Sequence, residues 1–222
     1  MNEEIIDVLI ENVLPITISK SKKNNNNKIN KVKRICLSDY MICCDSFFTY
    51  DECNKWIDFA ISKGFEKVSH PATKDIAYRN HYRIQYNDEN TASKIFQRIY
   101  QILPDSMKYI DNKKASGCSD NIRIYMYDSS EPNQSFGLHI DESNNHNGKV
   151  SKCTVLIYLS EVEGGRTLFY SGSGKSLKLV NFIEPLVGRL LIHGHGHRCL
   201  LHEGEVVKNG IKYCLRTDIL YS

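Results

Sequence analysis

The sequence has no apolar run that approaches the roughly 18 residues needed to span a membrane. Its first residues, MNEEIIDVLI, lack the basic start and the small-residue cleavage site of a secretory signal. No two cysteines have C-x-x-C spacing, which argues against a zinc ribbon. Without an export signal, we interpret the eight cysteines as reduced thiols rather than a disulfide framework. These absences predict a cytoplasmic protein with no membrane span.

Acidic residues are missing from one short stretch, residues 20–34, which holds seven lysines and arginines. Removing those seven charges from the net charge of +3 leaves about −4 for the rest of the chain. Such a body lacks the global charge signature of a nucleic-acid-binding protein. The tract KSKKNNNNKINKVKR is too polar to order itself by burial, so we interpret it as a solvated linker, with a partner-binding arm as the alternative. We therefore expect an N-terminal segment with a disordered Asn/Lys-rich tract, residues 1–34, and one folded domain, residues 35–222.

Helical patterns precede strand patterns along the chain. An apolar patch predicts a short helix that ends before Pro15. Thr49 and Glu52 form a capping box for a helix that ends near Gly64, and a second helix runs from about Asn90 to Pro104. From residue 121 onward the runs are strand-like: NIRIYMY, CTVLIYL, RTLFY, GRLLIH and KYCLRTDILY. This order predicts an α+β fold in which helices support an antiparallel β-sandwich or barrel.

The motif His139-Ile140-Asp141 has the spacing of a metal site. On a strand, residues i and i+2 point to the same face, so the imidazole and the carboxylate would converge. They would supply two ligands of a facial triad, which suits non-haem Fe(II) because it leaves coordination positions open. A lone H-x-D motif is weak evidence, and the third ligand must come from elsewhere. The candidates are His193, His195 and His197, which form HGHGH and could equally lie in a solvated loop, and His202.

A predicted strand ten residues after His202 carries a potential cosubstrate contact. Lys212, Cys214, Arg216 and Asp218 alternate along it and should share one face. A buried cation beside an iron site can pair with the distal carboxylate of a dicarboxylate cosubstrate.

Four ordered blocks of sequence carry a family resemblance: YMYDSSEPNQSFGLHID, TVLIYLSEVEGGRTLFY, EPLVGRLLIHGHGHRCLLHEG and GIKYCLRTDILY. From about residue 42 to residue 221, the chain resembles the catalytic domain of prolyl 4-hydroxylases, in the 2-oxoglutarate/Fe(II) dioxygenase family. The resemblance implies a double-stranded β-helix, or jelly roll, with N-terminal supporting helices. It also implies Fe(II), 2-oxoglutarate and O2 as cofactor and cosubstrates, with ascorbate as the reductant that keeps iron reduced.

The resemblance assigns roles to individual residues. His139, Asp141 and His202 match the family's iron ligands, and Lys212 matches the residue that holds the C5 carboxylate of 2-oxoglutarate. Three further positions match cosubstrate contacts, namely Tyr127, Tyr158 and Thr167, for which a purely structural role is the alternative.

One loop departs from the family pattern. The segment between Tyr127 and Phe136 is about three residues longer than the usual turn, which puts the role of Tyr127 in question. Arg79 and Arg83, in the run RNHYR, would line a peptide groove or a solvated strand face. Arg216 would bind cosubstrate or substrate, or would form an ion pair with Asp218 or another acid.

The resemblance implies hydroxylation of a protein or peptide residue, with proline favoured, and oxidative decarboxylation of 2-oxoglutarate to succinate and CO2. The same chemistry on a lysyl residue, a small molecule or a nucleic-acid base is an alternative. Nucleic acid is disfavoured because relatives that act on it usually have arginine at the position of Lys212. A non-catalytic jelly-roll binding module is the alternative from a different class.

Overall fold

The computed structural model describes residues 2–10, 13–14, 28–74 and 76–222. Within these ranges no helix is long and apolar enough to cross a membrane. The helices are α1 (Tyr50–Lys63), α2 (Glu89–Tyr100), α3 (Asp105–Lys108), and the short 3-10 turns η1 (Gly174–Ser176) and η2 (Gly196–Arg198). The predicted capping box is present, because the Thr49 hydroxyl accepts from the backbone N–H of Glu52 while the Glu52 carboxylate accepts from that of Thr49. The helix predicted to end near Gly64 is therefore confirmed as α1, and the one predicted from about Asn90 is confirmed as α2, which ends at Tyr100.

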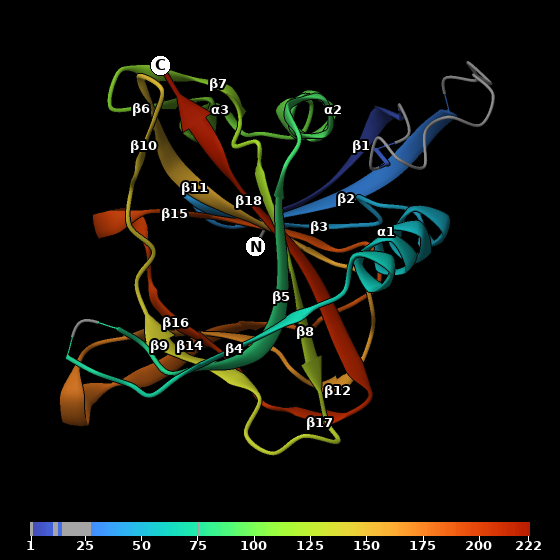
Figure 1. Cartoon of the computed structure of the whole chain (residues 1–222). Helices are drawn as coiled ribbons and strands as arrows, with labels where there is room; N and C mark the ends of the chain where they lie inside the picture. Colours follow the sequence, from blue (N-terminus) through green and yellow to red (C-terminus); the bar gives the residue numbers. More distant parts are fainter. Residues whose placement is uncertain (1, 11–12, 15–27, 75) are drawn as a thin grey trace.

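Antiparallel strands make up most of the fold. Their bounds are β1 (Asn2–Ile10), β2 (Lys28–Ser38), β3 (Met41–Asp45), β4 (Glu66–His70), β5 (Arg79–Asn87), β6 (Tyr109–Ile110), β7 (Lys113–Cys118), β8 (Asn121–Asp128), β9 (Ser135–His139), β10 (Asn145–His146), β11 (Lys149–Tyr158), β12 (Glu163–Gly164), β13 (Thr167–Ser171), β14 (Lys178–Ile183), β15 (Leu190–Gly194), β16 (Leu201–Gly204), β17 (Val207–Asn209) and β18 (Ile211–Tyr221). In the described residues the main path is β1-β2-β3-β15-β11-β18-β8-β5-β9-β16-β13-β14, and β12 pairs with β17 separately. Figure 1 shows β9, β14 and β16 together at the lower left, away from all three α-helices. The predicted α+β jelly-roll architecture is confirmed.

The central strands have two chemically different faces. On β18, Tyr213, Leu215 and Ile219 pack into the large core that also holds the apolar faces of α1 and α2. The residues that alternate with them, which include Lys212, Cys214 and Arg216, line a pocket on the opposite side of the strand. β8 and β11 alternate in the same way. Because successive side chains of a strand point to opposite faces, one set of residues supports the helices while the other set builds the pocket.

A buried ion pair fastens the helices to each other and to the start of the chain. Glu52 of α1 and Arg98 of α2 are 1% and 2% exposed, and Arg98 Nη2 lies 2.7 Å from Glu52 Oε1. The same carboxylate accepts a hydrogen bond from the backbone N–H of Val13. The Trp56 indole donates to the Val13 carbonyl at 2.8 Å. These contacts fix α1 and α2 behind the sheet that carries the pocket.

The N-terminal segment differs from the sequence-based expectation. The helix predicted before Pro15 is wrong, because residues 2–10 form β1, which pairs with β2. Val8 of β1 and Val32 of β2 are fully buried in the core. The pairing of β1 with β2 also supplies hydrogen bonds to the backbone N–H and C=O groups, which a helix would have satisfied internally. The expected boundary between residues 34 and 35 falls inside β2. Residues 28–34 of the Asn/Lys-rich tract are strand, and residues 15–27 lie outside the described residues.

Candidate metal and cosubstrate site

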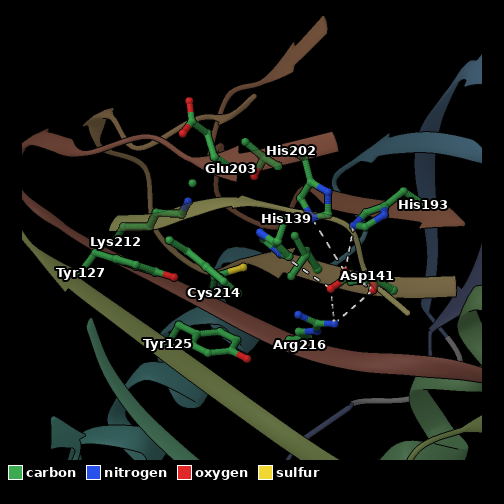
Figure 2. Close-up of a pocket in the computed structure, with 15 residues that line it drawn as sticks. Tyr125, Tyr127, His139, Asp141, His193, His202, Glu203, Lys212, Cys214 and Arg216 are labelled. Carbon is green, nitrogen blue, oxygen red and sulfur yellow. Dashed lines mark hydrogen bonds and ion pairs between the residues drawn. The ribbon is translucent and has the colours of Figure 1, made fainter. Parts of the chain in front are cut away.

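Two histidines meet across a strand pair at one end of the pocket. His139 ends β9 and lies directly opposite His202 of β16 in the strand register. Asp141 follows β9 by two residues. Its carboxylate oxygens lie 3.7 Å from His139 Nε2 and 3.8 Å from His202 Nε2. The structure therefore brings together the three predicted ligands (Figure 2).

Hydrogen bonds orient both imidazoles for metal binding. His139 Nδ1 lies 2.8 Å from the Gly137 carbonyl, and His202 Nδ1 lies 2.9 Å from the Leu200 carbonyl. A carbonyl only accepts, so each Nδ1 carries the proton and each Nε2 presents its lone pair to the pocket. Burial, and then the charge of His202, lower the pKa of His139 to about 4. Burial likewise lowers the pKa of His202. Both rings are therefore neutral near pH 7, as metal ligands must be.

The carboxylate of Asp141 is held as an anion. Burial by itself would raise its pKa, but the Arg216 guanidinium, followed by His193, holds that pKa well below its usual range. Arg216 Nη2 donates to Asp141 Oδ1 at 2.9 Å, and the Thr154 hydroxyl donates to Oδ2 at 2.6 Å. Arg216 lies farther from Asp218, at 3.7 Å. Of the roles foreseen for Arg216, the ion pair is present, and its principal partner is the predicted metal ligand itself.

Two more histidines that the sequence offered as candidate ligands, His193 and His195, also lie near Asp141. His193 of β15 is 1% exposed, and its Nε2 lies 3.6 Å from Asp141 Oδ2. His195 Nε2 is 2.8 Å from the Thr154 hydroxyl, which in turn donates to Asp141. Only His197 of the HGHGH motif is exposed. The alternation of histidine and glycine could have indicated that His193 is buried. His193 lies on the strand that begins at Leu190, and alternate side chains of a strand point to the same face.

Two clusters of side chains in the described part of the chain could hold a metal ion, and their donor atoms favour one of them. His193, Cys199 and His202 form a second cluster beside the triad. A cysteine sulfur is a soft ligand, which suits Zn²⁺ or Cu(I) better than the hard oxygen and imidazole environment of a non-haem iron site. His139, Asp141 and His202 instead offer two neutral imidazoles and one carboxylate. That combination fits Fe(II) in a non-haem site.

A buried lysine lies in the same pocket, away from the histidines. Lys212 is 5% exposed, and its ammonium group donates to the Gly165 carbonyl at 2.5 Å. Within the described residues no carboxylate forms an ion pair with it, and burial lowers its pKa. Gly165 has φ +63°, and a Cβ there would lie 3.2 Å from the Lys212 side chain, so glycine leaves room for the lysine stem. An uncompensated buried cation is costly, which makes this position suited to an anionic ligand.

The other predicted cosubstrate residues differ in their access to the pocket. Tyr127 lines it, with its ring centre 5.4 Å from Lys212 Nζ (Figure 2). Thr167 also lines it, whereas Tyr158 lies behind it and exchanges a hydrogen bond of 2.7 Å with the Thr167 hydroxyl. In this arrangement Tyr158 positions Thr167.

The long loop after Tyr127 does not displace that ring. Gln134, which is 1% exposed, accepts from the backbone N–H of Asp128 at 2.6 Å. Glu131 accepts from the Tyr82 hydroxyl and pairs with Lys67 at 2.8 Å. The additional residues are thus bound to β4 and β5, so the pocket keeps Tyr127 on its wall.

Comparisons with known proteins concern the fold. No family model and no curated protein matches the chain. Among solved structures, the viral collagen prolyl hydroxylase of Paramecium bursaria Chlorella virus-1, in complex with 2OG, aligns with a TM-score of 0.58 and 21% identity, covering 85% of this chain and 99% of that one. A Trichoplax adhaerens prolyl hydroxylase bound to a hypoxia-inducible factor peptide fragment aligns with a TM-score of 0.56 and 17% identity, covering 82% and 84%.

A prolyl 4-hydroxylase of Pseudomonas putida gives a TM-score of 0.53 and 13% identity over 81% of this chain and 91% of that one. A fourth similar structure, from Burkholderia pseudomallei, is described as an oxidoreductase of the 2OG-Fe(II) oxygenase family. The chain therefore has the fold that these prolyl hydroxylases and 2OG-Fe(II) oxygenases share.

Proposed function

We propose that the protein is a 2-oxoglutarate- and Fe(II)-dependent dioxygenase that hydroxylates a proline in a protein or peptide. One observation carries the proposal: the triad of His139, Asp141 and His202 lines the same pocket as the buried ammonium of Lys212, which forms no ion pair within the described residues. A non-catalytic jelly roll has no need for both features. The peptide and proline parts rest on the similar structures, which include a collagen prolyl hydroxylase and a prolyl hydroxylase with a bound peptide.

Each residue has a separate task in this proposal. The triad would hold Fe(II), which, with O2 and 2-oxoglutarate, supplies the oxidising power for C–H hydroxylation. Lys212 binds the distal carboxylate of 2-oxoglutarate and thereby fixes the orientation of the keto acid. Arg216 and Thr154 hold the Asp141 carboxylate in place by hydrogen bonds to its two oxygens. Tyr127 and Thr167 line the pocket near Lys212 and exclude water from this ion pair. Ascorbate would serve as the external reductant that keeps the iron in the Fe(II) state.

Anaerobic titration tests the oxygenase proposal directly. Adding Fe(II) and then 2-oxoglutarate to the protein should produce a metal-to-keto-acid absorption band, and His202→Ala should remove the band. A binding module would give no band with the wild-type protein. After air is admitted, peptide libraries incubated with ascorbate should gain the mass of one oxygen atom, located by fragmentation on proline. A gain located on lysine would support the oxygenase and reject proline as the target.

A further inference from the structure

A second hollow adjoins the metal site and is unusually rich in arginine. It shares Tyr125, Phe136, His139, Asp141 and Arg216 with the pocket described above. We call it the arginine groove, after the guanidinium groups that line it, those of Arg79, Arg83, Arg123 and Arg216. These come from three neighbouring strands, β5, β8 and β18. Whatever occupies the groove therefore lies next to the predicted metal ligands.

Four buried polar atoms without hydrogen-bond partners belong to residues that line this groove. Among the described residues, Arg79 Nε, Arg216 Nε and both ring nitrogens of His81 are buried and form no hydrogen bond. All three residues line the groove, and His81 is 1% exposed. Buried polar groups in folded proteins are almost always hydrogen-bonded. Their convergence on one hollow indicates a ligand that accepts hydrogen bonds there.

The charges in the groove specify the sign of that ligand. Asp141 and Glu142 are the acids that line it, and Asp141 is already paired with Arg216. Within the described residues Arg79, Arg83 and Arg123 form no ion pair with a carboxylate. Arg79 instead lies over the Phe136 ring, at 4.8 Å from its centre, and Arg123 donates to the Asn121 side chain. Three guanidinium groups thus remain available to an anion.

We propose that the arginine groove binds a carboxylate side chain of the peptide substrate, so that the enzyme selects prolines that have an acidic residue nearby. This proposal rests on the proposed function, because it places the acidic residue beside the reacting proline. The planar guanidinium matches a carboxylate with two parallel hydrogen bonds. A peptide fits better than nucleic acid, since outside the 20–34 tract the chain has a net charge of about −4, from a total of +3 less seven. Sequence-independent binding to a nucleic acid instead needs several lysine or arginine side chains that contact phosphates spread along the nucleic-acid strand.

Matched peptides and one arginine provide the test. Arg83 is suitable because it is half-buried and touches no predicted metal ligand, whereas Arg216 holds Asp141. The wild-type enzyme should hydroxylate a proline peptide with neighbouring Glu residues with a kcat/KM about tenfold above that of its Gln counterpart. Arg83→Gln should remove this preference, and Arg83→Glu should favour a Lys-containing peptide. Lys175→Gln, a change at an exposed residue that does not line the groove, should leave the preference unchanged.

The possible outcomes separate this proposal from the oxygenase proposal. Succinate formation without peptide and the absorption band with 2-oxoglutarate report the oxygenase itself, and Arg83→Gln should preserve both. If the enzyme hydroxylates Glu and Gln peptides equally well, the acidic-substrate proposal is overturned while the oxygenase proposal stands. Tighter binding of a single-stranded oligonucleotide than of the Glu peptide, lost in Arg83→Gln, would also overturn it in favour of a phosphate ligand. Absence of the band would instead remove the proposed function on which the inference rests.

Discussion

Replacing Lys212 with methionine isolates the contribution of the buried ammonium to 2-oxoglutarate binding. Methionine keeps most of the side-chain volume and removes the charge. Lys212 has no carboxylate partner within the described residues, so the distal carboxylate of 2-oxoglutarate would be its counter-ion. Loss of one partner from a desolvated, hydrogen-bonded charge pair costs on the order of 3 kcal/mol. The Kd for 2-oxoglutarate should therefore rise about a hundredfold.

A keto acid without the second carboxylate provides the internal control. 2-Oxobutyrate has the same keto-carboxylate end, so it should bind the wild-type protein and Lys212→Met with similar affinity. Both Kd values can be measured anaerobically from the absorption band in the presence of Fe(II). Lys208→Met, at an exposed position of β17, controls for the loss of a positive charge as such. The reasoning is refuted if Lys212→Met weakens 2-oxobutyrate as much as 2-oxoglutarate, because the lysine would then act on the pocket as a whole.

Three further predictions concern the metal, the helix anchor and acid stability. His202→Ala should abolish metal binding, measured by Co(II) titration. His195→Ala should weaken metal binding only about tenfold, because His195 acts through Thr154. Equal losses of metal affinity in the two variants would contradict the ligand assignment. Glu52→Gln should lower the free energy of unfolding in urea by about 3 kcal/mol, since it removes the carboxylate charge that pairs with the buried Arg98 guanidinium, and a loss below about 1 kcal/mol would contradict this. Burial, then Arg83 and Arg79, lower the pKa of His81 from 6.5 to about 4, so the unfolded chain binds more protons between these values and stability falls as the pH drops through that window. His81→Phe should reduce the stability lost between about pH 7 and pH 4.5 by roughly 2 to 3 kcal/mol, and an unchanged loss would show that His81 does not titrate there.

The sequence alone was sufficient to predict the central strands, both long helices and the helix cap. These features depend on local periodicity and on hydrogen bonds between residues three apart, such as Thr49 and Glu52. The pairing of His139 with Asp141 was also a local inference. Lys212 and Arg216 line one pocket as their spacing of four predicts. The N-terminal helix was wrong because β1 and β2 are stabilised by pairing across residues that are far apart in the chain.

The resemblance proposed His202 as the third ligand, but only the tertiary structure brings its ring beside His139 and Asp141. Four histidines lie within ten residues of one another, and local pattern could not rank them from geometry. The register of β16 against β9 sets His202 opposite His139, while the register of β15 against β11 sets His193 opposite Thr154. The arginine groove likewise joins residues from three strands. It includes His81, and the residues next to His81 in the sequence do not indicate that its side chain is buried. Convergence of distant segments depends on strand pairing over long sequence separations, which the amino-acid pattern of any one segment does not contain.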